Sequence, residues 1–176
     1  MKVLMIVPDG FEEIEAFCVI DILRRANVDV TVAGLTATSV EGIHKVRFFA
    51  DKRVTDINPN EYDMLVLPGG PGHKTLANSQ IVLNIIKDFN KKGKFLAAIC
   101  AAPSVLAKAG VLDDKIATIY PGMEKEIPKP RDARVIAHGN VITSRSPGTA
   151  IEFALKLVEI ATDKKTMKKI QSDLCV

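Results

Sequence analysis

The sequence predicts an α/β fold in which helices cover both faces of a mostly parallel sheet. Short, continuous apolar runs such as 3–7 and 64–67 end at turns rich in Pro and Gly, which is typical of buried parallel strands. These runs alternate with segments of helical periodicity, and the alternation predicts right-handed strand–helix–strand units. Because no linker or change in composition interrupts the pattern, we expect residues 1–176 to form a single domain.

The first helix is predicted over residues 12–26, directly after the first strand. Ile14, Phe17, Ile20 and Leu23 recur at three-residue spacing, so they define one broad apolar face. Acidic residues occupy its first turn and two arginines occupy its last turn, an arrangement that the helix dipole favours.

The remaining elements follow in chain order. Residues 28–33 alternate and are β-branched, which predicts a second strand, and a small hairpin is expected around 45–49. In the helix predicted at 81–92, we expect Ile81, Ile85, Ile86 and Phe89 to face inward. Further helices are expected at 103–109 and 151–161, and further strands at 64–67, 94–99, 115–119, 133–136 and 140–143. Segment 120–134 is rich in Pro, Lys and Glu and is a candidate functional loop.

Composition excludes several classes of partner. Twenty-four Lys and Arg against 21 Asp and Glu give a net charge of +3, which is too small to indicate a nucleic-acid or membrane surface. No segment approaches the roughly 20 apolar residues of a membrane helix, and no signal peptide is recognisable. The 3 cysteines are scattered rather than arranged as a disulfide framework. We therefore expect a cytoplasmic protein with no specific nucleic-acid or membrane partner.

Cys100 is the first candidate site residue, because it lies where a predicted strand turns directly into a helix. Ligands bind beyond the carboxyl ends of strands in such sheets, and a strand–turn–helix junction can expose a nucleophile. The positive end of the following helix favours a thiolate, while Ala101 permits close approach. The alternative is that Cys100 is a small buried hydrophobe, as most free cysteines are.

Glu15 and a glycine pair complete the candidate site. Glu15 lies early in the first helix among apolar neighbours, where burial would raise its pKa and keep it protonated near neutral pH. A protonated Glu15 could donate a hydrogen bond to a thiolate, so we expect Glu15→Gln to raise the Cys100 pKa or lower its reactivity. Gly69 and Gly70 could direct backbone N–H groups at an oxyanion. A solvated helix face and a plain turn are the alternatives for these positions.

Other candidates indicate ordinary structural roles. His44, His73 and His138 are far apart in the chain and none pairs with a cysteine or carboxylate at metal-ligand spacing, so no metal is expected. The segment 69–72 lacks the Lys-Ser/Thr of a phosphate loop. Cys18 is expected to pack in the core, Cys175 to lie in a frayed tail, and the lysines at 164–169 to form a solvated helix face.

Four ordered motifs resemble the ThiJ/PfpI superfamily, and within it the branch of the parkinsonism-associated deglycase and its bacterial ThiJ-like relatives. The motifs are Glu12-Glu13-Ile14-Glu15, Leu67-Pro68-Gly69-Gly70, Ala97-Ala98-Ile99-Cys100-Ala101-Ala102-Pro103 and Thr143-Ser144-Arg145-Ser146-Pro147-Gly148-Thr149. The resemblance covers nearly the whole chain. It implies a flavodoxin-like three-layer sandwich that forms a homodimer, with the first helix in the interface.

The resemblance also implies roles for individual residues. Cys100 would be the nucleophile in a strained elbow, and Glu15 the protonated acid beside its sulfur. Gly69, Gly70 and Ala101 would supply backbone donors. Arg25 would approach the site of the partner subunit.

Two departures from the family pattern affect the chemistry. Tyr120 stands where many members have a histidine beside the nucleophile, and a pKa of about 10 makes tyrosine a poor base at neutral pH. Ala101 follows Cys100 where PfpI-type peptidases place a histidine, which removes most support for a Cys-His peptidase.

Two functions of different classes remain open. In the first, the chain is a cofactor-independent glyoxalase that converts methylglyoxal to lactate through a Cys100 hemithioacetal, with Glu15 moving protons. The resemblance adds deglycase activity on glycated side chains and a role in carbonyl and oxidative stress. In the second, the protein is a redox-sensing stress protein or chaperone whose Cys100 oxidises to sulfinic acid without significant turnover.

Overall fold

A computed structural model describes all residues 1–176 and confirms the α/β fold. The strands are β1 (Lys2–Val7), β2 (Asp29–Gly34), β3 (Ser39–Glu41), β4 (Arg47–Phe49), β5 (Lys52–Arg53), β6 (Met64–Leu67), β7 (Phe95–Ile99), β8 (Val135–His138) and β9 (Val141–Ser144). The helices are α1 (Glu13–Arg25), α2 (His73–Asn78), α3 (Gln80–Lys91), α4 (Pro103–Lys108), α5 (Ala150–Ala161) and α6 (Lys164–Asp173).

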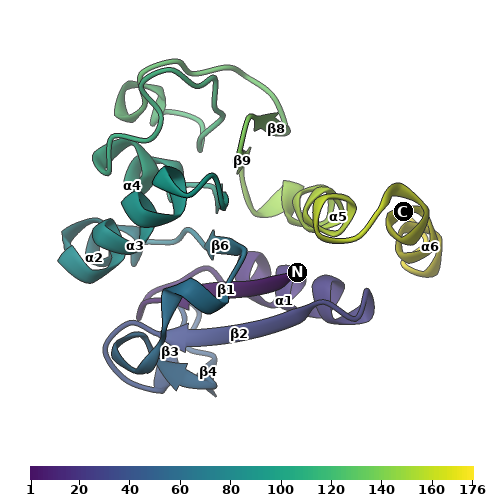
Figure 1. The fold of residues 1–176 in the computed structure, drawn as a ribbon, viewed down its shortest axis with the longest axis horizontal. Helices are drawn as coiled ribbons and strands as arrows, with labels where there is room; N and C mark the ends of the chain where they lie inside the picture. Colours follow the sequence, from purple (N-terminus) through teal and green to yellow (C-terminus); the bar gives the residue numbers. More distant parts are fainter.

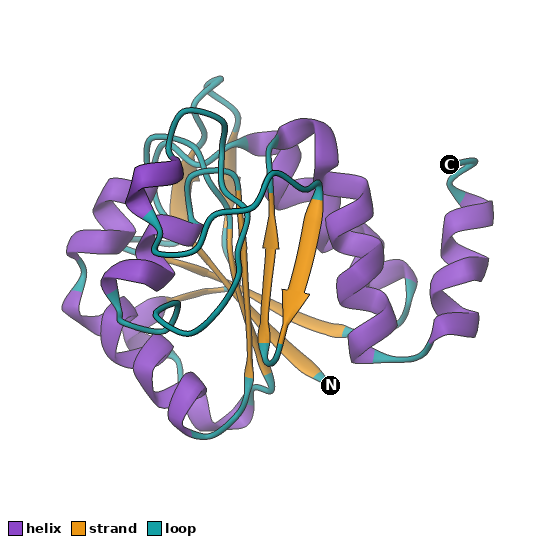
Figure 2. Ribbon diagram, turned by 90° about the horizontal axis from the view of Figure 1, so that it is seen from above, coloured by secondary structure: helices purple, strands orange, loops and turns teal.

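Seven strands form one sheet in the order β5-β2-β1-β6-β7-β9-β8. Neighbouring strands are parallel except for β8, which pairs antiparallel with β9 at one edge. Helices cover both faces of the sheet (Figures 1 and 2), with α1 and α5 packed together on one face and α2, α3 and α4 on the other. Helix α6 packs outside α5. The parallel strands bring the ends of β1, β6 and β7 to one edge, where the site lies.

The sheet separates two apolar cores, and β1 contributes to both. Val3, Met5 and Val7 belong to the core under α1 and α5, whereas Leu4 and Ile6 belong to the core under α3 and α4. All five side chains are fully buried, which explains why this strand is continuously apolar rather than alternating. Each such burial contributes roughly 1.5–3 kcal/mol to stability.

The prediction that Ile14 and Ile81 face inward, at the starts of their helices, is wrong. Ile14 is 58% exposed and Ile81 is 45% exposed. The buried residues of α1 instead begin with Glu13, Glu15 and Ala16, and those of α3 begin with Val82.

Other differences concern short elements. Residues 115–119 form no strand, and only an isolated bridge joins Ala117 to Pro130, because β8 takes the edge of the sheet beside β9. The hairpin expected around 45–49 is present as β3 paired with β4. Helix α2 was not predicted, whereas α6 confirms the solvated helix face expected for the lysines at 164–169. The first has only 6 residues after a Gly/Pro turn, and the second anchors a basic segment through the buried Ile170.

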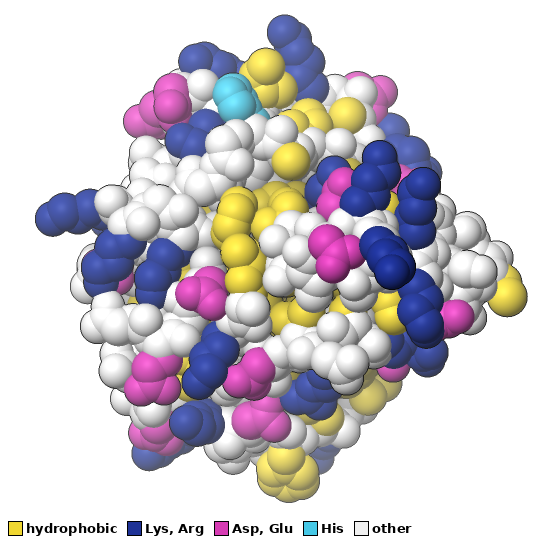
Figure 3. All heavy atoms as spheres, turned by 45° about the vertical axis from the view of Figure 1, so that its right-hand side comes forward, with side chains coloured by type: hydrophobic (Ala, Val, Ile, Leu, Met, Phe, Trp, Pro, Cys, Tyr) yellow, Lys and Arg dark blue, Asp and Glu magenta, His cyan; other side chains and the backbone are white.

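The surface carries charges of both signs. Lys and Arg side chains are interspersed with Asp and Glu side chains on the face in Figure 3, as the small net charge of +3 requires. No helix combines the length and the apolar character needed to cross a bilayer.

Candidate active site

Cys100 occupies a strained elbow between β7 and α4. Its φ angle is +63°, in the left-handed region that a residue with a Cβ rarely adopts. Hydrogen bonds hold this conformation on both sides of the residue. The Cys100 N–H donates to the Ser144 carbonyl at 2.8 Å, and the Cys100 carbonyl accepts from the Tyr120 N–H at 2.9 Å. The backbone is therefore strained at the one residue that both functional hypotheses require.

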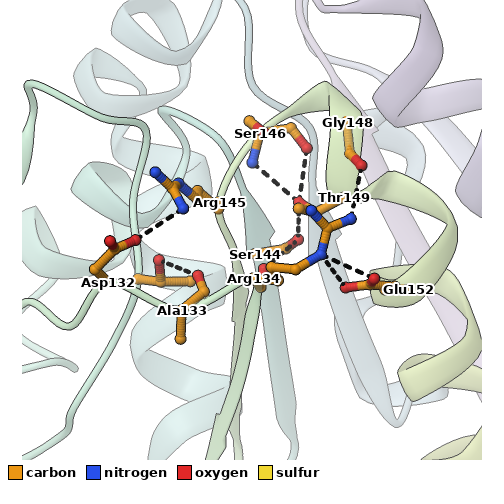
Figure 4. Close-up of polar contacts among 10 residues, drawn as sticks. Asp132, Ala133, Arg134, Ser144, Arg145, Ser146, Gly148, Thr149 and Glu152 are labelled. Atoms are coloured by element: carbon orange, nitrogen blue, oxygen red, sulfur yellow. Dashed lines mark hydrogen bonds and ion pairs between the residues drawn. The ribbon is translucent and has the colours of Figure 1, made fainter.

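The last residue of β9, Ser144, braces this elbow, and Figure 4 shows the contacts that hold Ser144 in place. The Oγ of Ser144 lies 2.7 Å from the Oγ1 of Thr149 and donates to the carbonyl of Arg134 at 3.1 Å. Arg134 in turn donates to the Glu152 carboxylate at 2.8 Å. Because Ser144 also accepts from Cys100, the family-like motif at 143–149 acts by positioning the elbow.

Glu15 lies against the same elbow and has no exposed surface. Its Oε2 accepts the Gly69 N–H at 2.7 Å, while its Oε1 is the only buried side-chain oxygen or nitrogen without a hydrogen-bond partner. A Cβ on Gly69 would lie 2.7 Å from the Glu15 Oε2 and 2.8 Å from the Cys100 Cβ. Gly69 therefore packs closely against both the acid and the cysteine.

Gly70 makes the adjoining turn and requires glycine for two reasons. Its φ angle is +84°, and a Cβ there would lie 2.6 Å from the Gly10 carbonyl oxygen. Backbone hydrogen bonds from Ala101 and Gly70 lower the pKa of the Cys100 thiol. The structure thus brings together Cys100, Glu15, Gly69, Gly70 and Ala101, as the sequence analysis expected.

The sequence predicted that the N-terminus of α4 would favour a thiolate at Cys100, but the pKa of Cys100 is raised rather than lowered. Burial, followed by the charge of Glu15, raises the pKa of Cys100 to about 12. Burial also raises the pKa of Glu15 to about 7, although contacts with Cys100 and Gly69 lower it. A thiolate and an ionised Glu15 disfavour each other, so the pair carries at most one negative charge near neutral pH. The thiolate is favoured only while Glu15 holds the proton.

A cavity of about 300 Å³ opens over Cys100. Its lining consists of Gly70, Pro71, His73, Lys74, Cys100, Ala101 and Tyr120. Tyr120 is half-exposed at the rim, and His73 is held by a 2.9 Å hydrogen bond from its Nδ1 to the Gly70 carbonyl. His73, which looks isolated in the sequence, follows Gly70 by three residues in the same turn after β6, and this spacing is the signal that could have placed it at the site.

Arg25 is not brought to this site within the chain. It pairs with Asp21 at 2.7 Å and lies ten residues after Glu15 on α1, a rise of about 15 Å along the helix. Its expected approach to a partner subunit stays a prediction.

The histidine prediction needs one correction. The Nδ1 of His44 lies 2.9 Å from the Glu13 Oε2 and 3.9 Å from the Glu12 Oε1, so a histidine does pair with carboxylates. This contact ties the β3–β4 hairpin to the start of α1. The other thiols lie outside the site: burial raises the pKa of Cys18 to about 11, and Cys175 is exposed.

A parallel sheet with a cysteine elbow beside a buried acid defines the class of protein, and sequence comparisons agree. The DJ-1/PfpI family model matches residues 1–160. Protein dj-1beta of Drosophila melanogaster is 38% identical over 98% of this chain and 96% of its own. Its crystal structure superposes with a TM-score of 0.96, covering 99% of this chain and 97% of that one.

Two further relatives have names that state an activity. A protein named glutathione-independent glyoxalase from Caenorhabditis elegans is 32% identical over 98% of this chain and 95% of its own. A protein named deglycase from Pyrococcus abyssi is 31% identical over 91% of this chain and 99% of its own. The chain belongs to the DJ-1/PfpI family.

Proposed function

We propose that the protein is a cofactor-independent glyoxalase that uses Cys100 to convert small α-oxoaldehydes into 2-hydroxy acids, with deglycase activity on glycated side chains as a consequence of the same aldehyde chemistry. The observation that carries this proposal is the elbow itself. Cys100 sits in a strained backbone conformation, open to a 300 Å³ cavity and beside a fully buried Glu15. The names of two relatives support the same chemistry.

The proposed reaction begins with transfer of the thiol proton from Cys100 as its sulfur adds to the aldehyde carbon of methylglyoxal. The aldehyde oxygen gains a proton, which gives a hemithioacetal. The Glu15 carboxylate then removes the proton on C1 and returns a proton to C2, so that an enediol rearranges to a thioester of lactate. Water cleaves the thioester, releases lactate and restores the thiol. The net change is methylglyoxal plus water to lactate, and a carboxyl with a pKa of about 7 can both accept and donate these protons.

The direct test is turnover by the purified wild-type protein. We expect methylglyoxal to disappear and lactate to accumulate in the presence of EDTA and without glutathione. Release of many lactate molecules per chain distinguishes catalysis from trapping of one aldehyde by one thiol. Loss of methylglyoxal limited to one equivalent, with no lactate, would contradict the proposal.

The second candidate, a redox sensor, is favoured by the unpartnered Glu15 Oε1. A protonated carboxyl at this position could donate to an oxygen on an oxidised Cys100 sulfur, which would stabilise a sulfinic acid. Absence of turnover, together with clean formation of sulfinate on Cys100 under peroxide, would support this candidate instead of the glyoxalase.

We also propose that two copies associate through the start of α1 and the β3–β4 hairpin. Ile14, Ile43, Val46 and Phe49 expose apolar side chains there, and Phe49 is 81% exposed. The Ile43 N–H donates to the Phe11 carbonyl at 2.9 Å, so the hairpin lies against the beginning of the helix. Apolar residues grouped in this way are typical of an interaction surface.

Sedimentation of the purified protein tests this association. We expect twice the 19.1 kDa chain mass for the wild type and a shift toward the single-chain mass for Phe49→Asp, because a charge would be buried without a partner. Ile81→Asp is the matched control, since Ile81 is an exposed apolar residue on the opposite helical layer. A wild-type protein that sediments as one chain would contradict the proposal.

A further inference from the structure

The cavity over Cys100 is larger than methylglyoxal requires. A volume of about 300 Å³ lies at the lower end of the range for pockets that enclose drug-sized ligands, whereas methylglyoxal has only five heavy atoms. The aldehyde carbon must lie beside the Cys100 sulfur for the proposed reaction. The rest of a larger ligand would then contact the other lining residues, to which α2 contributes His73 and Lys74.

Lys74 places an unneutralised positive charge on that wall. Its side chain is exposed and takes part in none of the ion pairs or side-chain hydrogen bonds of the chain. No Asp or Glu lines the cavity. Glu15, the nearest site carboxyl, is buried behind Gly69. A negatively charged substituent on the substrate would thus meet a cation without displacing a partner.

The neighbouring groove indicates that only one positive charge is available. This groove of about 840 Å³ shares His73 and Lys74 with the Cys100 cavity, and its other charged residues are Lys108 and Glu126. Lys108 donates to the Asn78 Oδ1 at 2.9 Å, whereas Lys74 has no side-chain partner, so Lys74 is the lysine of this groove whose ammonium group is free to bind an anion. One ammonium group balances one carboxylate.

We propose, on the basis of the function proposed above, that the preferred substrates are α-oxoaldehydes carrying a carboxylate, with Lys74 binding that carboxylate. The compound 4,5-dioxopentanoate has this chemistry, and its nine heavy atoms make it the larger of the two aldehydes. Cys100 attacks its aldehyde carbon, and addition of one water gives 2-hydroxyglutarate. His73, whose Nδ1 is already bonded to the Gly70 carbonyl, forms the wall beside Lys74.

The test compares 4,5-dioxopentanoate with its methyl ester, which has the same oxoaldehyde but no charge. We expect kcat/KM for the acid to exceed that for the ester about tenfold in the wild type, as a hydrogen bond to a charged group allows. Lys74→Met should abolish this preference, Lys74→Glu should reverse it, and Lys74→Arg should retain it. Lys87→Met, which removes an exposed lysine of α3 outside the cavity, should leave the acid-to-ester ratio unchanged.

Alkylation of Cys100 tests the positive charge of Lys74 without requiring catalytic turnover. Iodoacetate and iodoacetamide alkylate the same thiol and differ in charge, and exposed Cys175 serves as the internal reference. We expect Lys74→Met to lower the iodoacetate-to-iodoacetamide rate ratio at Cys100 about threefold, as measured by peptide mass spectrometry. This step depends on Coulombic attraction and should weaken with salt.

The outcomes distinguish the two proposals. Turnover of methylglyoxal with equal kcat/KM for acid and ester, in both wild type and Lys74→Met, would overturn the carboxylate subsite and leave the glyoxalase function standing. No turnover of any aldehyde would overturn the glyoxalase function. The alkylation ratio at Cys100 would then show whether Lys74 forms an anion-binding subsite. An alkylation ratio unaffected by Lys74→Met would overturn it.

Discussion

Cys100→Ser is expected to reduce lactate release from methylglyoxal by about 10³-fold or more, since loss of a nucleophile in a serine protease costs about 10⁶-fold. A serine hydroxyl is a far weaker nucleophile than a thiolate. The buried Glu15 cannot compensate, because its proton chemistry acts only after the carbon–sulfur bond has formed. Lactate and residual methylglyoxal, followed together over time, provide the measurement.

Folding does not confound this variant. Serine also carries a Cβ, so the strain at φ +63° is the same in both proteins, and a similar thermal midpoint is expected. Cys175→Ser is the matched control, because this thiol is exposed near the C-terminus and should leave turnover unchanged. Undiminished turnover by Cys100→Ser would remove Cys100 from the reaction.

The sequence predicts the elbow better than it predicts the surroundings of the elbow. An apolar strand that runs into Cys100 and a Pro at the start of α4 define a strand–turn–helix junction from local chemistry alone. The position of His73 depends on α2, which has only 6 residues and no usable periodicity. Ile14 shows a related limit, because the neighbouring Glu15 takes the inward position that an apolar pattern assigns to Ile14.

Whether Glu15 raises or lowers the pKa of Cys100 could be decided only from the structure. The sequence suggested a protonated donor that favours a thiolate, so that its loss would raise the Cys100 pKa. The structure places the two groups together against Gly69, where burial and then the charge of Glu15 raise the Cys100 pKa. A neutral replacement should therefore lower that pKa, which reverses the expectation.

Glu15→Gln is accordingly expected to change the reactivity of the Cys100 thiol and the turnover of methylglyoxal in opposite directions. A glutamine keeps an oxygen that can accept the Gly69 N–H, but it removes the negative charge and the transferable proton. Alkylation of Cys100 by iodoacetamide at pH 8 should become faster, while kcat for methylglyoxal should fall about 10²- to 10⁴-fold, the range for loss of general acid–base catalysis. A residue with a merely structural role would move both rates in the same direction. Parallel changes in the two rates would contradict the assignment.

The same substitution should change how stability depends on pH. The pKa of Glu15 is raised from 4.5 to about 7 in the folded protein, so between these values the folded state holds a proton that the unfolded chain has lost. Stability from this group therefore falls as pH rises through that window, by up to about 3 kcal/mol. Cys100, with a pKa raised from 9.0 to about 12, stays protonated in the folded protein and adds only a small slope near pH 8, where the unfolded thiol begins to ionise.

Comparison of wild type with Glu15→Gln isolates this contribution. Carboxylates with lowered pKa values, such as Glu13 and Asp56, act in the opposite direction, but they are present in both proteins and cancel in the difference. Urea unfolding from pH 4.5 to 8 should show the free energy of unfolding of Glu15→Gln rising relative to wild type. Any fixed cost of burying the amide shifts the whole curve and leaves its slope unaltered. Parallel curves would mean that Glu15 is ionised at pH 4.5 and above in the folded protein, which would remove it as a proton donor in the reaction.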